Sequence, residues 1–326
     1  MAASFMPRII GHAEVAAVLT FADLVPAIEK AHATFSRRND KCAEDGNEQN
    51  QSGVFPQRTM MPISQHEGVV YVMPIYSVAD DIVATKIVSN FKNNMEKHNI
   101  PSHLANIILN DSKTGMIKAI IDGDHVTGMR TAAASAVATK YLAREGADTL
   151  AILGAGSQAE YHLKAMRHIL KLKEIRVWTR SFEKAKAFAE KFDVVACETA
   201  REAVKDVDVI ASCTSAQTPV LEAGWLKEGV HINGVGACVP WAQELGSEVM
   251  RSAVVYSDST PGALQESGDV IHSKVEIFGE IGEVINGKVE AMRNKTTVYK
   301  SLGLAIQDAA ASRIVLDKVV GREKAT

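Results

Sequence analysis

The sequence predicts an α/β protein with a Rossmann-type, doubly wound parallel sheet and a second, discontinuous α+β domain. A glycine-rich turn joins a short apolar run to a helical pattern within 150–168. Apolar runs and helical patterns alternate from 150 to 258, whereas 54–122 holds successive β-rich runs. Alternating βα units favour a parallel sheet, and successive strands favour a meander. We therefore expect two sheets of different topology.

Length and composition narrow the class of protein. A chain of 326 residues is long enough for about two domains. Its 36 basic and 39 acidic residues give a net charge of −3, which disfavours nucleic acid and anionic membranes as partners. No apolar run reaches the ~18 residues of a membrane helix. Four widely spaced cysteines favour thiols in a reducing compartment over disulfides or a zinc site, so we expect a soluble, cytoplasmic protein without a metal centre.

The N-terminal region predicts helices and a loop. Residues 1–24 carry charges within their apolar part, which indicates a strand and two short helices and not a signal peptide. Asp23 is the expected N-cap of a helix over 21–36, which would leave Pro26 in the first turn. The apolar stripe of that helix is Phe21, Leu24, Ile28, Ala31 and Phe35. Residues 36–53 are polar and turn-rich, which predicts an exposed loop.

The following region predicts a β-meander and then a helix. Its β-rich runs lie at 69–73, 82–88, 104–109 and 116–121. The sequence D-S-K-T-G at 111–115 joins the last two runs as a hairpin turn. Residues 123–125 are expected to end the meander, and small residues at 126–142 predict a helix.

The second half of the chain alternates. The expected strands are 150–153, 175–178, 194–196, 207–213, 231–235 and 253–257, and the helices between them include 183–191 and 200–205. From Thr296 the sequence predicts a long amphipathic helix to the end of the chain. Because this helix lies outside the alternating pattern, we expect it to return to the first domain. The expected domains are 1–125 with 296–326, and 126–295.

The glycine-rich turn is the strongest motif. Gly154-Ala155-Gly156-Ser157-Gln158-Ala159 follows a buried strand and opens a helix, which is the order of the dinucleotide-binding fingerprint. Gly154 allows the tight turn, and Gly156 allows close approach of a pyrophosphate. Free N–H groups and the positive end of the helix would face the phosphates. The alternative is a tight βα turn that binds nothing.

The end of the second strand favours NADP over NAD. NAD-binding folds usually carry a carboxylate there for the ribose 2′-OH. Here Trp178 is followed by Thr179, Arg180 and Ser181, with Lys184 one helical turn on. The guanidinium fork of Arg180 and the hydroxyls suit a 2′-phosphate. The alternative is a solvated arginine at a helix start, and the nearby Glu183 weakens the signal.

Three cations mark the first domain. Arg58 starts a strand, Lys86 interrupts the apolar run 82–88, and Arg130 begins a small-residue helix. A lysine within such a run must face either solvent or a lined cavity. A small carboxylate substrate would need such charges to converge on it, whereas each cation alone is more often an ordinary surface residue.

Motifs along nearly the whole chain, apart from the loop at 36–53, match one family. They are Arg58-Thr59, Val72-Met73-Pro74, Thr85-Lys86, Pro101-Ser102-His103, Met129-Arg130-Thr131-Ala132-Ala133, Leu153-Gly154-Ala155-Gly156, Gly234-Val235-Gly236-Ala237, Glu266-Ser267-Gly268-Asp269 and Lys300-Ser301-Leu302-Gly303. The chain resembles the ornithine cyclodeaminase/mu-crystallin family, and within it the ketimine reductase branch. The resemblance implies a homodimer with a discontinuous substrate-binding and dimerisation domain and an NADP-binding Rossmann domain.

The resemblance also assigns residues to roles. It implies that Arg58, Lys86 and Arg130 hold the substrate carboxylate, with Lys86 and Arg130 as catalytic residues and Glu266 as a second polar candidate. The residues implied for the nicotinamide half of the cofactor are Ser102, His103, Arg130, Thr131, Thr214, Ser215, Val235, Ser301 and Leu302. Those implied for the 2′-phosphate are Thr179, Arg180, Ser181 and Lys184.

The function that the resemblance implies is NADPH-dependent reduction of cyclic ketimine carboxylates, such as Δ1-piperideine-2-carboxylate and Δ1-pyrroline-2-carboxylate, to cyclic amino acids. Lys86 is the candidate for relaying the proton to the imine, because a desolvated lysine near other cations has a lowered pKa. Tyr71 and Cys238 stand where the cyclodeaminase branch has carboxylates, which argues against cyclisation of ornithine. The alternatives are a crystallin-type protein that binds thyroid hormone (an iodothyronine), an alanine-dehydrogenase-like enzyme and an ornithine-cyclodeaminase-like member of the family.

Overall fold

The computed structural model describes residues 6–38 and 52–325, and the chain forms two compact units. Unit 1 comprises Met1–Arg130 and Leu304–Thr326, and unit 2 comprises Thr131–Gly303. Most of the expected loop, residues 39–51, lies outside the described residues. Within the described ranges, no helix combines the length and the apolar character that crossing a membrane requires.

Unit 1 is built on a seven-stranded sheet in the order β1-β7-β6-β5-β4-β2, with β3 also beside β4. β1 runs parallel to β7, and the other neighbours are antiparallel. The strands are β1 Arg8–Ile10, β2 Gly53–Val54, β3 Thr59–Ile63, β4 Gly68–Ser77, β5 Ile82–Phe91, β6 His103–Asp111 and β7 Ile117–Asp122. Asp111 closes the hairpin turn by accepting hydrogen bonds from the backbone of Lys113 and Thr114 at 3.1 and 2.9 Å. The predicted meander and its turn are confirmed.

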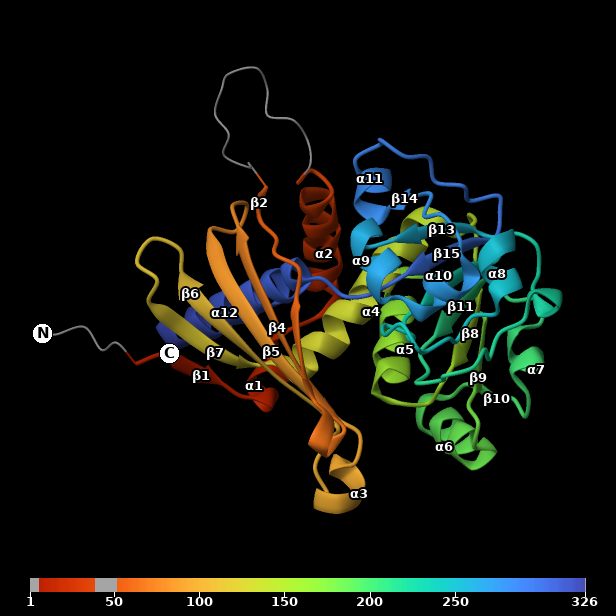
Figure 1. Cartoon of the computed structure of the whole chain (residues 1–326), viewed down its shortest axis with the longest axis horizontal. Helices are drawn as coiled ribbons and strands as arrows, with labels where there is room; N and C mark the ends of the chain where they lie inside the picture. The colour runs from red at the N-terminus through yellow and green to blue at the C-terminus, as the bar shows by residue number, and fades with distance from the viewer. Residues whose placement is uncertain (1–5, 39–51, 326) are drawn as a thin grey trace, which may run out of the picture. The chain divides into compact units, whose positions relative to one another are not determined.

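Helices cover one face of this sheet, with α12 running behind the strands in Figure 1. α12 (Ala305–Ala325) packs on β4, β5 and β6, α1 (His12–Val18) packs on β7, and α2 (Phe21–Phe35) packs on α12. The short helices η1 (Ser64–His66) and α3 (Asn94–His98) lie between strands in the sequence. Along β5, Ala84, Lys86 and Val88 are buried while Ile87 is exposed. Because side chains alternate along a strand, the buried set faces the helices.

The expected cap of α2 is wrong. Thr20 is the N-cap, with extended backbone, and its side chain accepts a hydrogen bond from the Asp23 N–H at 3.4 Å. Asp23 instead lies in the first turn, where a carboxylate interacts favourably with the helix dipole. Pro26 is consequently inside the helix and not in its first turn. Its missing N–H leaves one intrahelical hydrogen bond unmade.

α4 (Gly123–Leu142) begins at Gly123 and not at Val126. Gly123, Asp124 and His125, which were expected to end the meander, form its first turn. A Cβ on Gly123 would lie 2.8 Å from the backbone carbonyl carbon of Ala105, so only glycine fits here. The boundary between the two units falls within this helix, after Arg130.

Unit 2 contains an eight-stranded parallel sheet in the order β10-β9-β8-β11-β12-β15-β13-β14. The strands are β8 Thr149–Leu153, β9 Glu174–Trp178, β10 Val195–Ala196, β11 Val209–Ser212, β12 His231–Gly234, β13 Val254–Ser257, β14 Gly279–Glu280 and β15 Thr297–Lys300. The helices that accompany them are α5 Ser157–Ile169, α6 Phe182–Phe192, α7 Ala200–Val204, η2 Ala223–Trp225, α8 Ser247–Ser252, α9 Thr260–Glu266, α10 Gly268–Ser273 and α11 Ile281–Ile285. The predicted Rossmann-type sheet is confirmed.

The expected helix from Thr296 is wrong at its start. Residues Thr297–Lys300 form β15, which lies between β12 and β13, and α12 begins only at Ala305. The physical reason is the local sequence T-V-Y, whose β-branched and aromatic residues favour a strand. The boundaries between the units fall along the chain at Arg130/Thr131 and Gly303/Leu304, whereas boundaries at 125/126 and 295/296 were expected.

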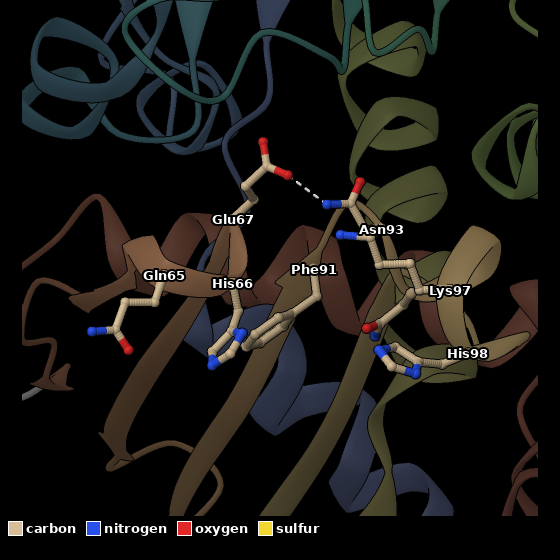
Figure 2. Close-up of a pocket in the computed structure, with 8 residues that line it drawn as sticks. Gln65, His66, Glu67, Phe91, Asn93, Lys97 and His98 are labelled. Carbon is tan, nitrogen blue, oxygen red and sulfur yellow. Dashed lines mark hydrogen bonds between the residues drawn. The ribbon is translucent and has the colours of Figure 1, made fainter.

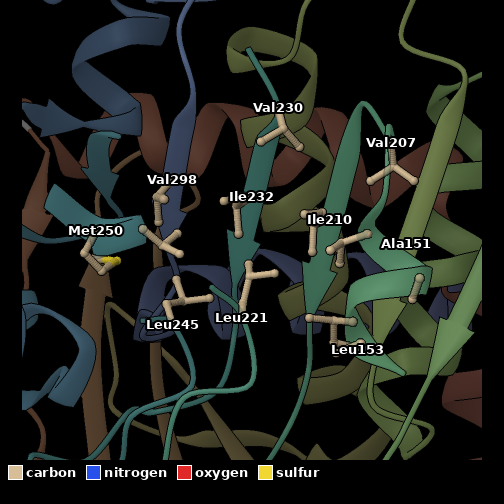
Figure 3. Packing of buried hydrophobic residues seen from close by; sticks show 14 of the residues in the cluster. Ala151, Leu153, Val207, Ile210, Leu221, Val230, Ile232, Leu245, Met250 and Val298 are labelled. Carbon is tan, nitrogen blue, oxygen red and sulfur yellow. The ribbon is translucent and has the colours of Figure 1, made fainter. Parts of the chain in front are cut away.

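β15 completes the core of unit 2 (Figure 3). Val298 on β15 pairs with Ile232 on β12, and both side chains are fully buried. Leu153, Ile210 and Leu245 belong to the same apolar cluster. Burying each such side chain stabilises the fold by ~1.5–3 kcal/mol relative to leaving it exposed. The core therefore fixes the carboxyl ends of the central strands, from which the loops described below emerge.

Candidate functional site

Lys86 lies on the helix-covered face of the unit 1 sheet. The strand register places it opposite Met73 on β4 and Ile107 on β6. Its exposed fraction is 2%. Of the two environments that the sequence allowed for a lysine in an apolar strand, it occupies the enclosed one.

One carboxylate from α12 binds two of the predicted cations. The Lys86 Nζ lies 2.7 Å from the Asp308 Oδ2, and the Arg130 Nε donates to the Asp308 Oδ1 at 3.0 Å. The Arg130 Nη1 donates to the Gln307 Oε1 at 2.9 Å. Gln307 in turn lies 3.3 Å from the imidazole Nε2 of His32 on α2. Lys86 and Arg130 are thus brought together around Asp308, which the sequence reasoning missed.

This arrangement lowers the pKa of Lys86 to about 8. Burial is the largest cause, and the positive charge of Arg130 is the next. The charge and hydrogen bond of Asp308 act in the opposite direction, and Arg58 adds a further small lowering. Because ~8 is near neutral pH, Lys86 can change its protonation state during a reaction, unlike an ordinary lysine.

Arg58 and His103 also belong to unit 1, but their side chains are more exposed than that of Lys86. Arg58 precedes β3, and His103 begins β6. The Arg58 guanidinium carbon lies 5.5 Å from the centre of the Tyr71 ring. The His103 Nδ1 lies 2.8 Å from the Asp124 Oδ1, and both side chains are partly exposed. The preceding Ser102 donates to the Lys92 carbonyl oxygen at 3.5 Å. Asp124 therefore fixes the orientation of the imidazole through one of its two nitrogens.

The glycine-rich turn of unit 2 fits a dinucleotide. Gly154 has φ +108°, and a Cβ there would lie 2.6 Å from the Cys213 carbonyl oxygen. Gly156 is the extended N-cap of α5 and makes no side-chain cap hydrogen bond, and a Cβ on it would meet nothing within 4 Å. The buried Oε1 of Gln158 has no hydrogen-bond partner among the described residues. Open N–H groups at the start of a 13-residue helix suit the phosphates of a dinucleotide.

The carboxyl end of β9 presents the predicted 2′-phosphate residues. Thr179 is partly buried, and Arg180, Ser181 and Lys184 are exposed. Glu183, which weakened the prediction from sequence, forms an ion pair with Lys186 at 2.6 Å. Its carboxylate thus has a cationic partner of its own on the surface of α6.

The other predicted cofactor residues in unit 2 follow neighbouring strands. Thr214 and Ser215 follow β11, Val235 follows β12, and Ser301 and Leu302 follow β15. A Cβ on Gly154 would lie 3.7 Å from the Thr214 Cγ2, so this loop approaches the glycine-rich turn. The carboxyl edge of a parallel sheet is where dinucleotides bind. Ala155 and Ser157 belong to the turn itself, and Thr131 is buried on α4.

A second buried charge cluster lies beneath this edge and was also missed. The Lys300 Nζ lies 3.0 Å from the Asp269 Oδ2 and donates to the Gly236 carbonyl oxygen. The Asp269 Oδ1 accepts from the N–H groups of Glu244 and Leu245 at 2.8 and 3.0 Å. Burial raises the pKa of Glu244 to about 8, against the opposing charge of Lys300. Lys300 thus links the segment after β12, through Gly236, to the first turn of α10, through Asp269.

The sequence singles out three further positions. They are the substrate-binding candidate Glu266 and the two positions that lack carboxylates, Tyr71 and Cys238. Glu266 ends α9 in unit 2, whereas Arg58, Lys86 and Arg130 belong to unit 1. The Cys238 thiol donates to the Val235 and Ser301 carbonyl oxygens at 3.2 and 3.4 Å. Tyr71 packs in a small apolar cluster with Met73, Val88, Ala105 and Ala305.

A pocket of about 310 Å³ in unit 1 contains none of the predicted site residues. Figure 2 shows its polar lining and the hydrogen bond from Asn93 to Glu67. The lining residues are Gln65, His66, Glu67, Phe91, Asn93, Asn94, Lys97 and His98. Most of these side chains are exposed. They do not enclose a charged group, unlike the buried cluster of Lys86, Arg130 and Asp308 (the Asp308 cluster).

Comparisons with known proteins bear on both units. The model of the ornithine cyclodeaminase/mu-crystallin family matches residues 20–323. Ketimine reductase mu-crystallin of Macropus fuliginosus is 43% identical over 297 residues, which cover 90% of this chain and 91% of the relative. The resemblance inferred from the motifs is thereby confirmed.

Two solved structures share the fold. Thermococcus litoralis Δ1-pyrroline-2-carboxylate reductase, in complex with NADH and L-proline, superposes with a TM-score of 0.89 at 32% identity and covers 97% of this chain and 98% of its own. An archaeal alanine dehydrogenase dimer with bound NAD gives a TM-score of 0.88 at 27% identity and 97% coverage of both chains. The predicted fold class is confirmed along the described chain.

Proposed function

Because the chain belongs to the ornithine cyclodeaminase/mu-crystallin family, we propose that it reduces cyclic ketimine carboxylates to cyclic amino acids with a reduced nicotinamide cofactor. Δ1-Piperideine-2-carboxylate and Δ1-pyrroline-2-carboxylate are the proposed substrates. The observation that carries this proposal is the buried cluster of Lys86, Arg130 and Asp308, in which a lysine of lowered pKa lies beside an arginine.

The cluster provides the two interactions that the reaction needs. Lys86, Arg130 and Arg58 outnumber the one carboxylate of Asp308, so the cluster attracts the substrate carboxylate. Asp308 and Gln307 occupy Nε and Nη1 of Arg130, which leaves Nη2 for the substrate. The Lys86 ammonium donates its proton to the imine nitrogen, which makes the imine carbon a better hydride acceptor. The reduced nicotinamide, when bound, supplies the hydride.

We propose that the preferred cofactor is NADPH. Arg180 and Lys184 are exposed at the tip of β9, and Glu183 is paired with Lys186. Both related structures hold the cofactor without a 2′-phosphate, so the preference rests on these residues of this chain. We expect Arg180→Ala to raise the KM for NADPH by about tenfold and to change that for NADH little. Equal losses for the two cofactors would refute the 2′-phosphate role, and Lys171→Ala, at an exposed lysine before β9, is the matched surface control.

Initial rates of cofactor oxidation test the reaction. The purified full chain is offered the two cyclic ketimines, pyruvate with ammonia, and, in the reverse direction with oxidised cofactor, alanine. Ornithine is assayed for release of ammonia and proline, which we expect to be absent because Tyr71 and Cys238 replace carboxylates. Faster turnover of pyruvate with ammonia would assign the alanine dehydrogenase reaction instead. Binding of an iodothyronine without turnover of any ketimine would assign the hormone-binding alternative.

We propose that two copies of the chain form a dimer through the sheet face of unit 1 that faces away from α12. On this face Met61, Ile87 and Ile9 have exposed fractions of 51, 41 and 58%. Exposed apolar side chains on the open face of a sheet favour burial against a partner. We expect a dimer by light scattering for the wild type and a shift towards monomer for Ile87→Lys. A fully active wild-type monomer would refute the proposal.

The proposed compartment is the cytoplasm. Cys197, Cys213 and Cys238 are free thiols, and the two last lie beside the carboxyl edge of the unit 2 sheet. Free thiols at such positions suit a reducing compartment. Fractionation of the tagged chain in its source cells tests this assignment, and recovery with a secreted fraction would refute it.

A further inference from the structure

We propose that Asp308 is a positioning residue of this reaction, whose carboxylate orients both Lys86 and Arg130 and keeps Lys86 charged for proton delivery. This inference rests on the proposed function and deepens it. Asp308 lies on α12, near the end of the chain, and belongs to none of the sequence motifs that point to the site. Its role follows from the contacts, burial and charges around it.

The contacts of Asp308 fix two side chains from two other elements. Its Oδ2 holds the Lys86 Nζ of β5 at 2.7 Å, and its Oδ1 holds the Arg130 Nε of α4 at 3.0 Å. The exposed fractions of the Lys86, Arg130 and Asp308 side chains are 2, 7 and 2%. A buried ion pair persists only where partners satisfy it, and one carboxylate here satisfies two. Loss of the carboxylate would therefore free both cations at once.

Asp308 also sets which edge of Arg130 can meet a ligand. The guanidinium is a rigid plane, so fixing Nε and Nη1 fixes the direction of Nη2 as well. Gln307, the neighbour of Asp308 on α12, fixes Nη1 at 2.9 Å. The Gln307 Oε1 also accepts from the Leu304 N–H at 3.3 Å, which ties it to the start of the helix. The first turn of α12 thus presents both arginine contacts as one preorganised unit.

Asp308 raises the pKa of Lys86, whereas the other influences on that pKa lower it. The charged and titratable groups around Lys86 are Arg130 on α4, Arg58 before β3, Asp308 on α12 and, beyond Gln307, His32 on α2. Burial and both arginines lower the pKa of Lys86, and only Asp308 raises it. Without Asp308, Lys86 would be neutral at physiological pH and would have no proton to give.

The step is a simple proton transfer. An N–H bond of the Lys86 ammonium breaks, and an N–H bond forms at the imine nitrogen. Lys86 becomes a neutral amine, and Asp308 remains ion-paired with Arg130. The carboxylate is thus compensated before and after the transfer, so its position does not have to change.

The test is the pH dependence of kcat/KM for the full chain with a cyclic ketimine and saturating reduced cofactor. If the charged form of Lys86 is required, wild-type activity falls as pH rises through about 8. This fall is the alkaline limb of the pH profile. We expect Asp308→Asn to move the limb to lower pH by about one to three units, the usual effect of an opposite charge at this distance. A folded Asp308→Asn enzyme whose limb stays at the wild-type pH would overturn the proposal.

Two further variants separate positioning from folding. Asp208→Asn removes another buried carboxylate, which pairs with Lys227 and Arg144 in unit 2, and we expect it to lower stability without moving the limb. Asp308→Glu keeps the charge but lengthens the side chain. We expect it to keep the limb near the wild-type pH while kcat falls, because the two cations are displaced. A limb that moves equally in Asp208→Asn would show a merely structural effect.

A direct titration of Lys86 distinguishes failure of this inference from failure of the proposed function. The Nζ resonance of Lys86, assigned by its loss in Lys86→Met, is followed against pH by NMR in wild type and in Asp308→Asn. We expect a lower pKa in the variant. If the wild type reduced no cyclic ketimine, the proposed function would fail, yet this titration would still decide whether Asp308 keeps Lys86 charged. An unchanged pKa would overturn the inference whatever the substrate.

Discussion

Two buried lysine–aspartate pairs, one in each unit, behave as opposites. Lys86 and Asp308 are 2.7 Å apart with 2% exposure each, and Lys300 and Asp269 are 3.0 Å apart with none. Burial opposes the charge of both lysines. In unit 1 the pKa of Lys86 falls to about 8, whereas in unit 2 burial is outweighed by the combined attraction of Asp269, Cys238 and Glu244, which raises the pKa of Lys300.

The difference lies in the neighbours of each pair. Lys86 shares its carboxylate with Arg130 and feels the charge of Arg58. Lys300 has its aspartate without a competing arginine and also faces Glu244 and the Gly236 carbonyl oxygen. An excess of cations makes a buried lysine titratable, and an excess of acceptors makes it permanently charged. The unit 1 pair is thus suited to chemistry and the unit 2 pair to holding loops.

The largest expected effect is therefore on stability, from Lys300→Met. This change leaves the buried Asp269 without its cation, and breaking a buried pair costs about 3–5 kcal/mol. We expect the melting temperature to fall by about 6–20 °C. Lys86→Met is the matched variant, because Asp308 keeps Arg130 as a partner and loses less. Equal losses of stability in the two variants, measured by calorimetry, would contradict the distinction between the pairs.

Lys86→Met should instead affect turnover. It keeps the length of the side chain but removes the proton that the imine requires. We expect kcat to fall by at least ~10²-fold, the lower range for losing an acid–base group, and the limb of the pH–rate profile near pH 8 to disappear. Wild-type turnover with wild-type pH dependence would mean that this buried lysine is only structural, and the unit 1 site would have to be withdrawn.

Glu244 makes the stability of unit 2 depend on pH. Its folded-state pKa is raised by burial from 4.5 to about 8, so the folded state holds a proton that the unfolded state releases above pH 4.5. Stability is therefore full below pH 4.5 and declines as pH rises to about 8. We expect Glu244→Gln to raise the melting temperature by about 2–4 °C at pH 8, roughly 1 kcal/mol, with little effect at pH 4.5. Parallel curves of melting temperature against pH would show that Glu244 is ionised in the folded protein.

The contrast between the pairs also shows what a sequence can reveal. Lys86 was singled out because a charge interrupts an apolar strand of period two, and a strand has only two faces. Asp308 carries the same kind of signal, a carboxylate within L-A-I-Q-D-A-A-A, but a helix of small residues has no sharp boundary between faces. Its partner lies more than two hundred residues away in the chain, and no local pattern records that pairing.

Lys300 and Asp269 both lie in motifs that match the family, but their ion pair was hidden by an error in secondary structure. The helix expected from Thr296 absorbed T-V-Y-K, although its β-branched and aromatic residues favour a strand. Because a strand of four residues is too short to show a period, the strong pattern of the following helix extended over it. Once β15 is a central strand, Lys300 lies at its carboxyl end, where a buried charge must find a partner. The glycine turn needed no such information, since its chemistry lies within six consecutive residues.

Arg58→Ala has the smallest expected effect and sharpens the comparison most. Arg58 is half-buried and lies near the Tyr71 ring, so in the proposed site it serves as an outer clamp for the substrate carboxylate. We expect its loss to raise the KM for the ketimine by about tenfold, the lower range for a charged hydrogen bond, with little change in kcat.

Because the charge of Arg58 lowers the pKa of Lys86, the limb near pH 8 should move slightly upward, opposite to its shift in Asp308→Asn. Opposite shifts from removing a cation and removing an anion would show that the balance of charges around Lys86 sets its pKa. An unmoved limb in Arg58→Ala would mean that burial alone sets it, and the distinction between the two lysines would then rest on packing and not on their neighbours' charges.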